Sequence, residues 1–130
     1  MRQILLFALL AASLALLSGC ALSRAKADTA EDMTDKAAYQ KISAEEAYEM
    51  MASQEVVVVD VRAREEYESG HIENAVLVPN ENIGSEMPEA LPDKEATLLI
   101  YCRSGRRSKD AAQKLLALGY QSVYDFGGVI

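Results

Sequence analysis

The run EVVVVDV, residues 55–61, constrains the fold more than any other segment of this chain. Four valines, residues 56–59, follow one another without polar interruption, and all are β-branched, which favours an extended backbone. A continuous apolar strand is typical of a parallel sheet that is covered on both faces. The run therefore predicts a buried central strand in an α/β fold.

The segments on either side of this run alternate between strand and helix patterns. Further strands are expected at residues 39–42, 74–79, 97–102 and 121–126, and helices at residues 43–53, 63–70 and 108–119. Ser43 and Glu46 form a capping-box pattern at the start of the first helix, and Gly119 is placed to end the last. The prolines within residues 80–96 forbid a long helix there. We predict an α/β fold with a central parallel sheet of about five strands and helices on both faces.

The N-terminal segment has the pattern of a secretion signal. Arg2 precedes an uncharged, largely apolar stretch, residues 4–17, which fits the core of a signal peptide and is too short to span a membrane. The sequence LSGC follows and resembles the bacterial lipobox, whose cysteine is lipidated and becomes the mature N-terminus. We expect residues 1–19 to be a lipoprotein signal peptide. Cys20 would then anchor the protein by several acyl chains to the extracytoplasmic side of the bacterial envelope, the periplasmic face in a diderm.

Two alternatives to this leader stay open. The sequence AKA, residues 25–27, matches a small-x-small cleavage site and would give a soluble secreted protein. The apolar segment would otherwise stay uncleaved as an anchor. Residues 20–38 comprise the lipidated cysteine and a polar, charged, alanine-rich stretch, which we expect to be a flexible tether. A single domain is expected at residues 39–130.

Charge and cysteine content narrow the function. The 130 residues carry 20 acidic and 13 basic side chains, a formal charge of −7, and this balance argues against nucleic acid as a partner. The arginines at positions 103, 106 and 107 form a local basic cluster on this acidic chain. If Cys20 carries lipid, Cys102 has no intrachain disulfide partner. A lone thiol outside the cytoplasm indicates a reactive group or an intermolecular partner.

The segment CRSGRRS, residues 102–108, places that thiol between a predicted strand and a predicted helix. Ligands bind at the carboxyl ends of strands in open α/β sheets, and the free N–H groups of a helix N-terminus attract anions. Gly105 permits a tight loop whose amides turn inward. Neighbouring arginines and a helix N-terminus lower the pKa of a cysteine. These residues predict a thiolate that attacks an anionic electrophile, although a buried cysteine at a strand end is often inert.

Three ordered motifs resemble those of the rhodanese-like sulfurtransferases. The loop CRSGRRS is similar to the family's active-site loop C-R-x-G-x-R through its cysteine, first arginine, glycine and last arginine. Residues 56–79, VVVVDVRAREEYESGHIENAVLVP, resemble the block D-V-R-x-x-x-E-[FY]-x-x-G-H-I-x-x-A-x-x-x-P. Residues 123–128, VYDFGG, resemble the closing strand and glycine pair. Family members usually continue beyond this pair, so the chain as given is either a truncated or a naturally short member.

The resemblance implies a rhodanese-like fold and a persulfide mechanism. Cys102 would be the catalytic residue, taking a sulfur from thiosulfate or a related donor, releasing sulfite and passing the sulfur to cyanide or a thiol. Members of the family need no metal or organic cofactor. The substrate-binding residues are expected to be Arg103, Ser104, Gly105, Arg106 and Arg107. The guanidinium fork of Arg107 is expected to point into the pocket and hold the anionic donor.

Supporting roles are expected for Asp60, Arg62, His71 and Ser108. Asp60 and Arg62 should pair, or bond to the backbone, near a strand end, and His71 should bond to nearby backbone. Rhodanese-fold phosphatases and arsenate reductases have a loop one residue longer, with an arginine at the position of Ser108, so these activities are weaker alternatives. A non-catalytic module that binds sulfur species or a partner protein is the alternative from another functional class.

Overall fold

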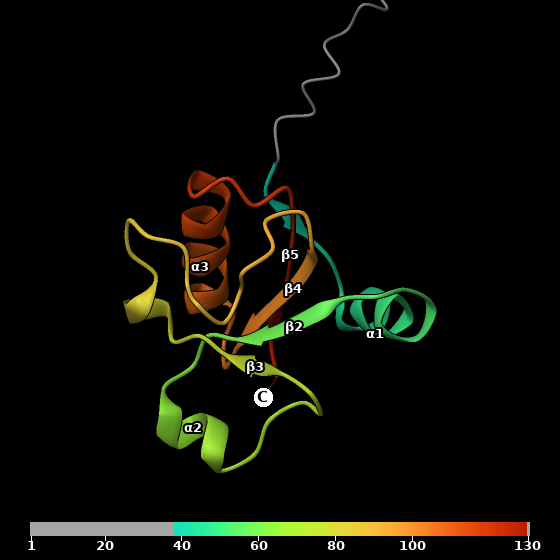
Figure 1. Ribbon diagram of the computed structural model, residues 1–130. Coiled ribbons are helices and arrows are strands. Elements are labelled where there is room, and N and C mark those ends of the chain that lie inside the picture. Colours follow the sequence, from blue (N-terminus) through green and yellow to red (C-terminus); the bar gives the residue numbers. More distant parts are fainter. Residues whose placement is uncertain (1–37, 130) are drawn as a thin grey trace, which may run out of the picture. The chain divides into compact units, whose positions relative to one another are not determined.

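The computed structural model describes residues 38–129, which form a five-stranded, wholly parallel sheet in the order β1-β5-β4-β2-β3 (Figure 1). The strands are β1 Gln40–Lys41, β2 Val57–Asp60, β3 Val76–Leu77, β4 Thr97–Cys102 and β5 Ser122–Gly128. The helices are α1 Ala44–Ser53, α2 Arg64–Glu68, the 3-10 helix η1 Asn80–Asn82, and α3 Arg106–Ala117. The predicted α/β parallel sheet is confirmed. The predicted signal peptide, Cys20 and the tether up to residue 37 lie outside the described residues.

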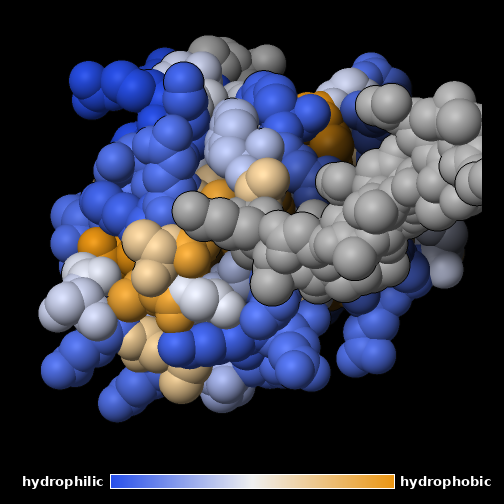
Figure 2. Space-filling view, turned by 90° about the horizontal axis from the view of Figure 1, so that it is seen from above, coloured by the Kyte–Doolittle hydropathy of each residue, from blue (hydrophilic) through white to orange (hydrophobic). Residues whose placement is uncertain are grey.

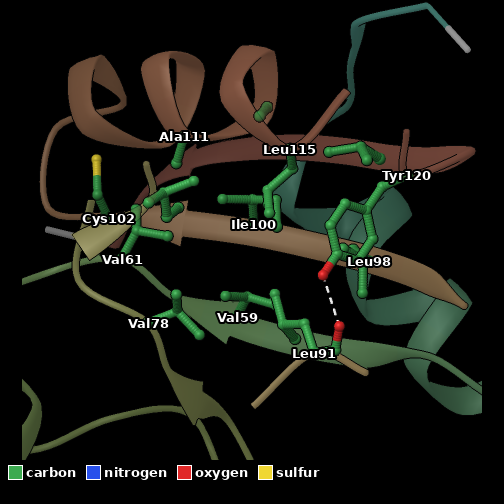
Figure 3. Close-up of a cluster of buried hydrophobic side chains, with 13 residues drawn as sticks. Val59, Val61, Val78, Leu91, Leu98, Ile100, Cys102, Ala111, Leu115 and Tyr120 are labelled. Atoms are coloured by element: carbon green, nitrogen blue, oxygen red, sulfur yellow. Dashed lines mark hydrogen bonds between the residues drawn. The ribbon is translucent and has the colours of Figure 1, made fainter. Parts of the chain in front are cut away.

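Helices cover both faces of the sheet because the side chains of a strand point alternately to its two sides. On one face, Ile100 of β4 belongs to the same buried cluster as Leu115 of α3 (Figure 3). On the other face, Leu99 clusters with Ala47 of α1. Residues 58–61 are buried, as the continuous apolar run predicts. The central strands are therefore enclosed by packed side chains on both faces.

The surface of the domain is mainly polar. Figure 2 views the molecule from the end at which α3 finishes, and the visible part of that face is mostly hydrophilic, with apolar residues gathered in one area. Among the described residues, no helix has the length and apolar character needed to cross a membrane. The carboxyl ends of β2 and β4 lie side by side, between the start of α3 and α2 (Figure 1).

Local signals set the ends of the helices. The Ser43 hydroxyl accepts a hydrogen bond from the Glu46 amide, and the Glu46 carboxylate accepts one from the Ser43 amide, which confirms the predicted capping box. Helix α3 begins at Arg106, earlier than predicted, because Gly105 adopts a φ of +93° and caps it. The helix ends before Gly119, whose φ of +96° closes its last turn as expected.

Strand β5 runs beyond its predicted end and lies against the loop that follows Cys102. Gly128 is paired in register with Cys102, and the Val129 amide donates to the Cys102 carbonyl oxygen at 3.2 Å. A Cβ atom on Gly128 would overlap the carbonyl oxygen of Arg103 and lie 2.9 Å from the Cα atom of Ser104. Glycine is therefore required where this strand end meets the loop.

We predict that Gly128→Ala lowers the free energy of unfolding by about 1–3 kcal/mol, because the strand end must move away from the loop. Chemical denaturation of the purified proteins measures the change. Gly84→Ala is the matched control, since a Cβ atom there meets no atom within 4 Å. Equal stability of the two variants would contradict the steric argument.

Candidate active site

Cys102 is the last residue of β4, and its side chain is fully buried. Figure 3 shows its sulfur directed toward the turn that precedes α3. The Gly105 amide donates to Sγ at 3.0 Å, and Ser108 Oγ lies 3.6 Å from Sγ. Ser108 Oγ also lies 3.1 Å from the carbonyl oxygen of Gly105, so its single proton can be donated either to that oxygen or to a deprotonated sulfur. The loop and the first turn of α3 thus place hydrogen-bond donors around the sulfur.

Two opposing effects act on the pKa of Cys102. Burial raises this pKa because it disfavours the charged thiolate. Hydrogen bonds from the Ser108 hydroxyl and from the amides of Ser108, Gly105 and Ser104 lower it by more in total, so the pKa lies below its ordinary value. The predicted direction is therefore found, but its main causes are hydrogen bonds rather than the arginine charges.

The guanidinium fork of Arg107 is bonded to Glu66. Its Nη1 donates to Oε2 at 2.6 Å and its Nη2 to Oε1 at 2.9 Å, which joins the start of α3 to α2. The Ala63 amide also donates to Glu66 Oε2, at 3.0 Å. Hydrogen bonds from Arg107, and then from Ala63, lower the pKa of Glu66 to about 2, so this carboxylate is charged at neutral pH. The fork was expected to point into a pocket and hold the donor, but in this structure it bonds to Glu66, and donor binding by Arg107 stays a prediction.

A pocket of about 270 Å³ lies beside the loop that follows Cys102. Its lining residues are Arg62, Glu66, Ser69, Arg103 and Val129. Arg62 is paired with Asp60, and Glu66 with Arg107. Arg103 forms no ion pair with any other residue in the range 38–129. The side chain of Arg103 is therefore available to attract an anion to this pocket.

Asp60 and Arg62 form a pair at the end of β2, as predicted. The Arg62 Nη2 donates to Asp60 Oδ2 at 2.6 Å and to the carbonyl oxygen of Gly70 at 2.7 Å. The Tyr101 hydroxyl donates to the same Asp60 oxygen at 2.6 Å. Asp60 and Tyr101 are fully buried, so these bonds satisfy groups that water cannot reach. The network supports the strand end rather than contacting Sγ.

The side chains of His71 and Arg106 are not among the groups that hydrogen-bond to Cys102 Sγ. The imidazole of His71 is stacked on Tyr67, with ring centroids 3.6 Å apart, and its Nδ1 lies 2.8 Å from the Tyr67 carbonyl oxygen. The expected bond to nearby backbone is thus present. Arg106 is exposed as the first residue of α3. In residues 38–129, no group of three or more histidine, cysteine and acidic side chains is arranged to hold a metal ion.

Glu66 and Tyr101 are two hydrogen-bonding partners in this region that were not predicted from the sequence. Each is 41 residues from the side chain that it bonds, Arg107 and Asp60 respectively. No local spacing rule connects residues so far apart. One signal was available for Tyr101, because a hydroxyl in a buried apolar strand needs a hydrogen-bond partner.

Known proteins resemble this chain in sequence. The profile of the rhodanese-like domain matches residues 43–129. A tRNA uridine(34) hydroxylase of Hamiltonella defensa is 37% identical over 114 residues, covering 82% of this chain and 32% of that protein. The protein of the same name from Yersinia pestis (strain Pestoides F) is 34% identical over 94 residues, covering 68% of this chain and 26% of its own length. The chain therefore spans about a third or less of these curated relatives.

Solved structures share the fold. A human single-domain sulfurtransferase superposes with a TM-score of 0.61 at 27% identity, covering 69% of this chain and 90% of that one. A rhodanese with anions from E. coli gives a TM-score of 0.53 at 34% identity, with coverage of 57% and 87%. A rhodanese-like domain protein from Staphylococcus aureus gives 0.59 at 33% identity, with coverage of 68% and 86%.

We predict that the rate of Cys102 alkylation by iodoacetamide rises with pH at a midpoint below that of a free cysteine. Ser108→Ala should move this midpoint upward, because it removes the hydroxyl that bonds the thiolate. Ser104→Ala is the control, since Ser104 acts on the thiolate through its backbone amide. A wild-type midpoint at the free-cysteine value, or the same midpoint in both variants, would contradict this account of the thiol.

Proposed function

The chain belongs to the rhodanese-like domain family, and on this basis we propose that it is a sulfurtransferase that moves a sulfane sulfur from thiosulfate or a related donor to a thiol or cyanide. The observation that supports this most directly is the set of donors at Cys102 Sγ, with the Gly105 amide at 3.0 Å. Core packing alone does not call for hydrogen-bond donors around a buried sulfur. Their effect on the pKa of Cys102 favours the thiolate, which is the form that attacks sulfur.

In the proposed first half-reaction, the Cys102 thiolate attacks the outer sulfur of thiosulfate. A new S–S bond forms on Cys102, and the S–S bond of thiosulfate breaks, with its electron pair leaving on sulfite. The loop amides and the Ser108 hydroxyl would then bond to the persulfide. In the second half-reaction, cyanide or a thiolate attacks the outer sulfur, and Cys102 leaves as the thiolate that these donors stabilise. Cys102 itself carries the sulfur, so the proposal includes no cofactor.

The loop residues have distinct proposed roles in binding the donor. Arg103 lines the pocket and would draw the donor toward it by charge. The amides of Ser104 and Gly105 would hold the transferred sulfur. Arg106 is exposed, and it would act on the donor only through the electrostatic attraction of its positive charge. Arg107 would contact an anionic donor only after its fork leaves Glu66.

Two other functions differ from sulfur transfer: binding without catalysis, and tRNA hydroxylation. The full burial of Cys102 favours, as a second candidate, a non-catalytic module that binds sulfur species or a partner protein. The tRNA hydroxylation named for the curated relatives is not proposed for this chain. This chain spans about a third or less of those proteins, and its net negative charge opposes binding to RNA.

We predict that the wild-type protein gains the mass of one sulfur atom after treatment with thiosulfate, and that cyanide removes this sulfur as thiocyanate. Cys102→Ser should gain no sulfur and form no thiocyanate while still unfolding cooperatively, because only the covalent carrier is lost. Intact-mass spectrometry and a thiocyanate assay measure both effects. Thiocyanate production by folded Cys102→Ser would contradict the mechanism, and a wild type that takes up no sulfur would favour the non-catalytic module.

We propose, from the LSGC pattern, that Cys20 is lipidated and holds the domain at the extracytoplasmic side of the bacterial envelope. Full-length wild type should then fractionate with membranes, and Cys20→Ala should lose its acyl chains, as shown by mass spectrometry of the N-terminal peptide. If both proteins are soluble and begin at Asp28, cleavage occurs after the sequence AKA and the localisation is wrong.

A further inference from the structure

The ion pair between Glu66 and Arg107 lies at the reactive pocket. Glu66 lines this pocket, and Arg107 is the second residue of α3, directly after the loop that bonds to Sγ. The pKa of Arg107 is raised mainly by its hydrogen bond to Glu66 and also by the charge of Cys102. The Arg107 guanidinium is therefore close enough to Cys102 for their charges to interact. The group that pairs with Arg107 thus affects the electrostatic potential at the thiol.

The carboxylate of Glu66 uses the donors that an oxyanion would need. Its two oxygens take one Nη donor each, at 2.6 and 2.9 Å, which is the bidentate arrangement that a guanidinium fork offers to carboxylates and other oxyanions. The Arg107 and Glu66 side chains are 28% and 30% exposed. An anion in the adjoining pocket therefore approaches a pair that is open to solvent on one side.

Helix α2 has other bonds that hold it in place. The Tyr67 hydroxyl donates to the Ala75 carbonyl oxygen at 2.7 Å, and Arg62 bonds to the carbonyl oxygen of Gly70 just beyond the helix. Neither contact involves the carboxylate of Glu66, and the amide oxygen of a glutamine can still accept the hydrogen bond from Ala63. The charge of the ion pair is thus separable from the position of the helix.

We propose that Glu66 is a specificity-determining residue, which competes with anionic substrates for the guanidinium fork of Arg107. While the pair is closed, it adds no net charge to the pocket. An oxyanion that displaces Glu66 gains a bidentate partner, whereas an uncharged molecule gains nothing from the exchange. Glu66 therefore limits the preference of the site for anions such as the sulfonate-like end of thiosulfate. The inference deepens the proposed function, on which the identity of the anion rests.

The test compares two alkylating reagents at Cys102, anionic iodoacetate and uncharged iodoacetamide. Both react with the same thiolate, so the ratio of their rates reports local charge and is independent of the thiolate fraction. Mass spectrometry of the peptide that contains Cys102 measures each rate. Glu66→Gln should raise the ratio of iodoacetate to iodoacetamide rates about fivefold, the effect of roughly 1 kcal/mol for a partly exposed charge.

Matched variants separate this charge effect from a structural one. Glu65→Gln removes the same charge from an exposed position of α2 and should leave the ratio near the wild-type value. Arg107→Gln leaves Glu66 as an unpaired anion and should lower the ratio. The double variant Glu66→Gln with Arg107→Gln should return it toward wild type, because the pocket again holds neither charge.

Two results would overturn the inference. In one, Glu66→Gln and Glu65→Gln give the same ratio. In the other, Glu66→Gln slows both reagents equally, which would mean that the pair only holds α2 against α3. If Glu66→Gln does not fold, an Arg107→Gln variant whose ratio equals that of the wild type would also overturn the inference. Alkylation of Cys102 does not require sulfur transfer. A wild type that forms no persulfide would therefore contradict the proposed function, while the alkylation test of Glu66 would still be valid.

Discussion

The hydrogen bond from the Gly105 amide to Cys102 Sγ is the interaction on which the rest of the site depends. It forms because β4 ends at the cysteine and α3 begins a few residues later, after a glycine with a φ of +93°. This turn points amides, which a regular strand would use for pairing, at the sulfur instead. The buried parallel sheet holds one side of the turn and α3 the other, so the fold fixes the sulfur and its donors together.

Charge around this turn is largely balanced by pairs. Asp60 pairs with Arg62, and Glu66 pairs with Arg107, so two of the basic groups in this region are each balanced by a carboxylate. The thiolate is stabilised mainly by amide dipoles and one hydroxyl, which are fixed in place and need no reorganisation when charge develops. A basic cluster in the sequence is therefore an incomplete guide to the electrostatics of the folded site.

Most of the architecture followed from local patterns. The apolar run at residues 55–61 predicted the buried strand, and the Ser43–Glu46 pattern predicted the first helix start. The start of α3 and the end of β5 were misplaced, because both depend on glycines that adapt to neighbouring segments. Gly105 caps the helix, and Gly128 lets the strand continue against the loop. Glycine itself has no strong preference that would have marked either boundary.

The sequence by itself determined the parallel α/β class, the position of Cys102 at a strand end and the loop that follows it, because hydrophobic periodicity and turn chemistry act between near neighbours. Only the tertiary structure decided which group the guanidinium fork of Arg107 binds. Arg107 was expected to face a donor, yet it bonds to Glu66, 41 residues away in the chain. Such a pairing arises from the way α2 comes to lie beside the start of α3, and long-range packing of this kind has no signature in the spacing of residues.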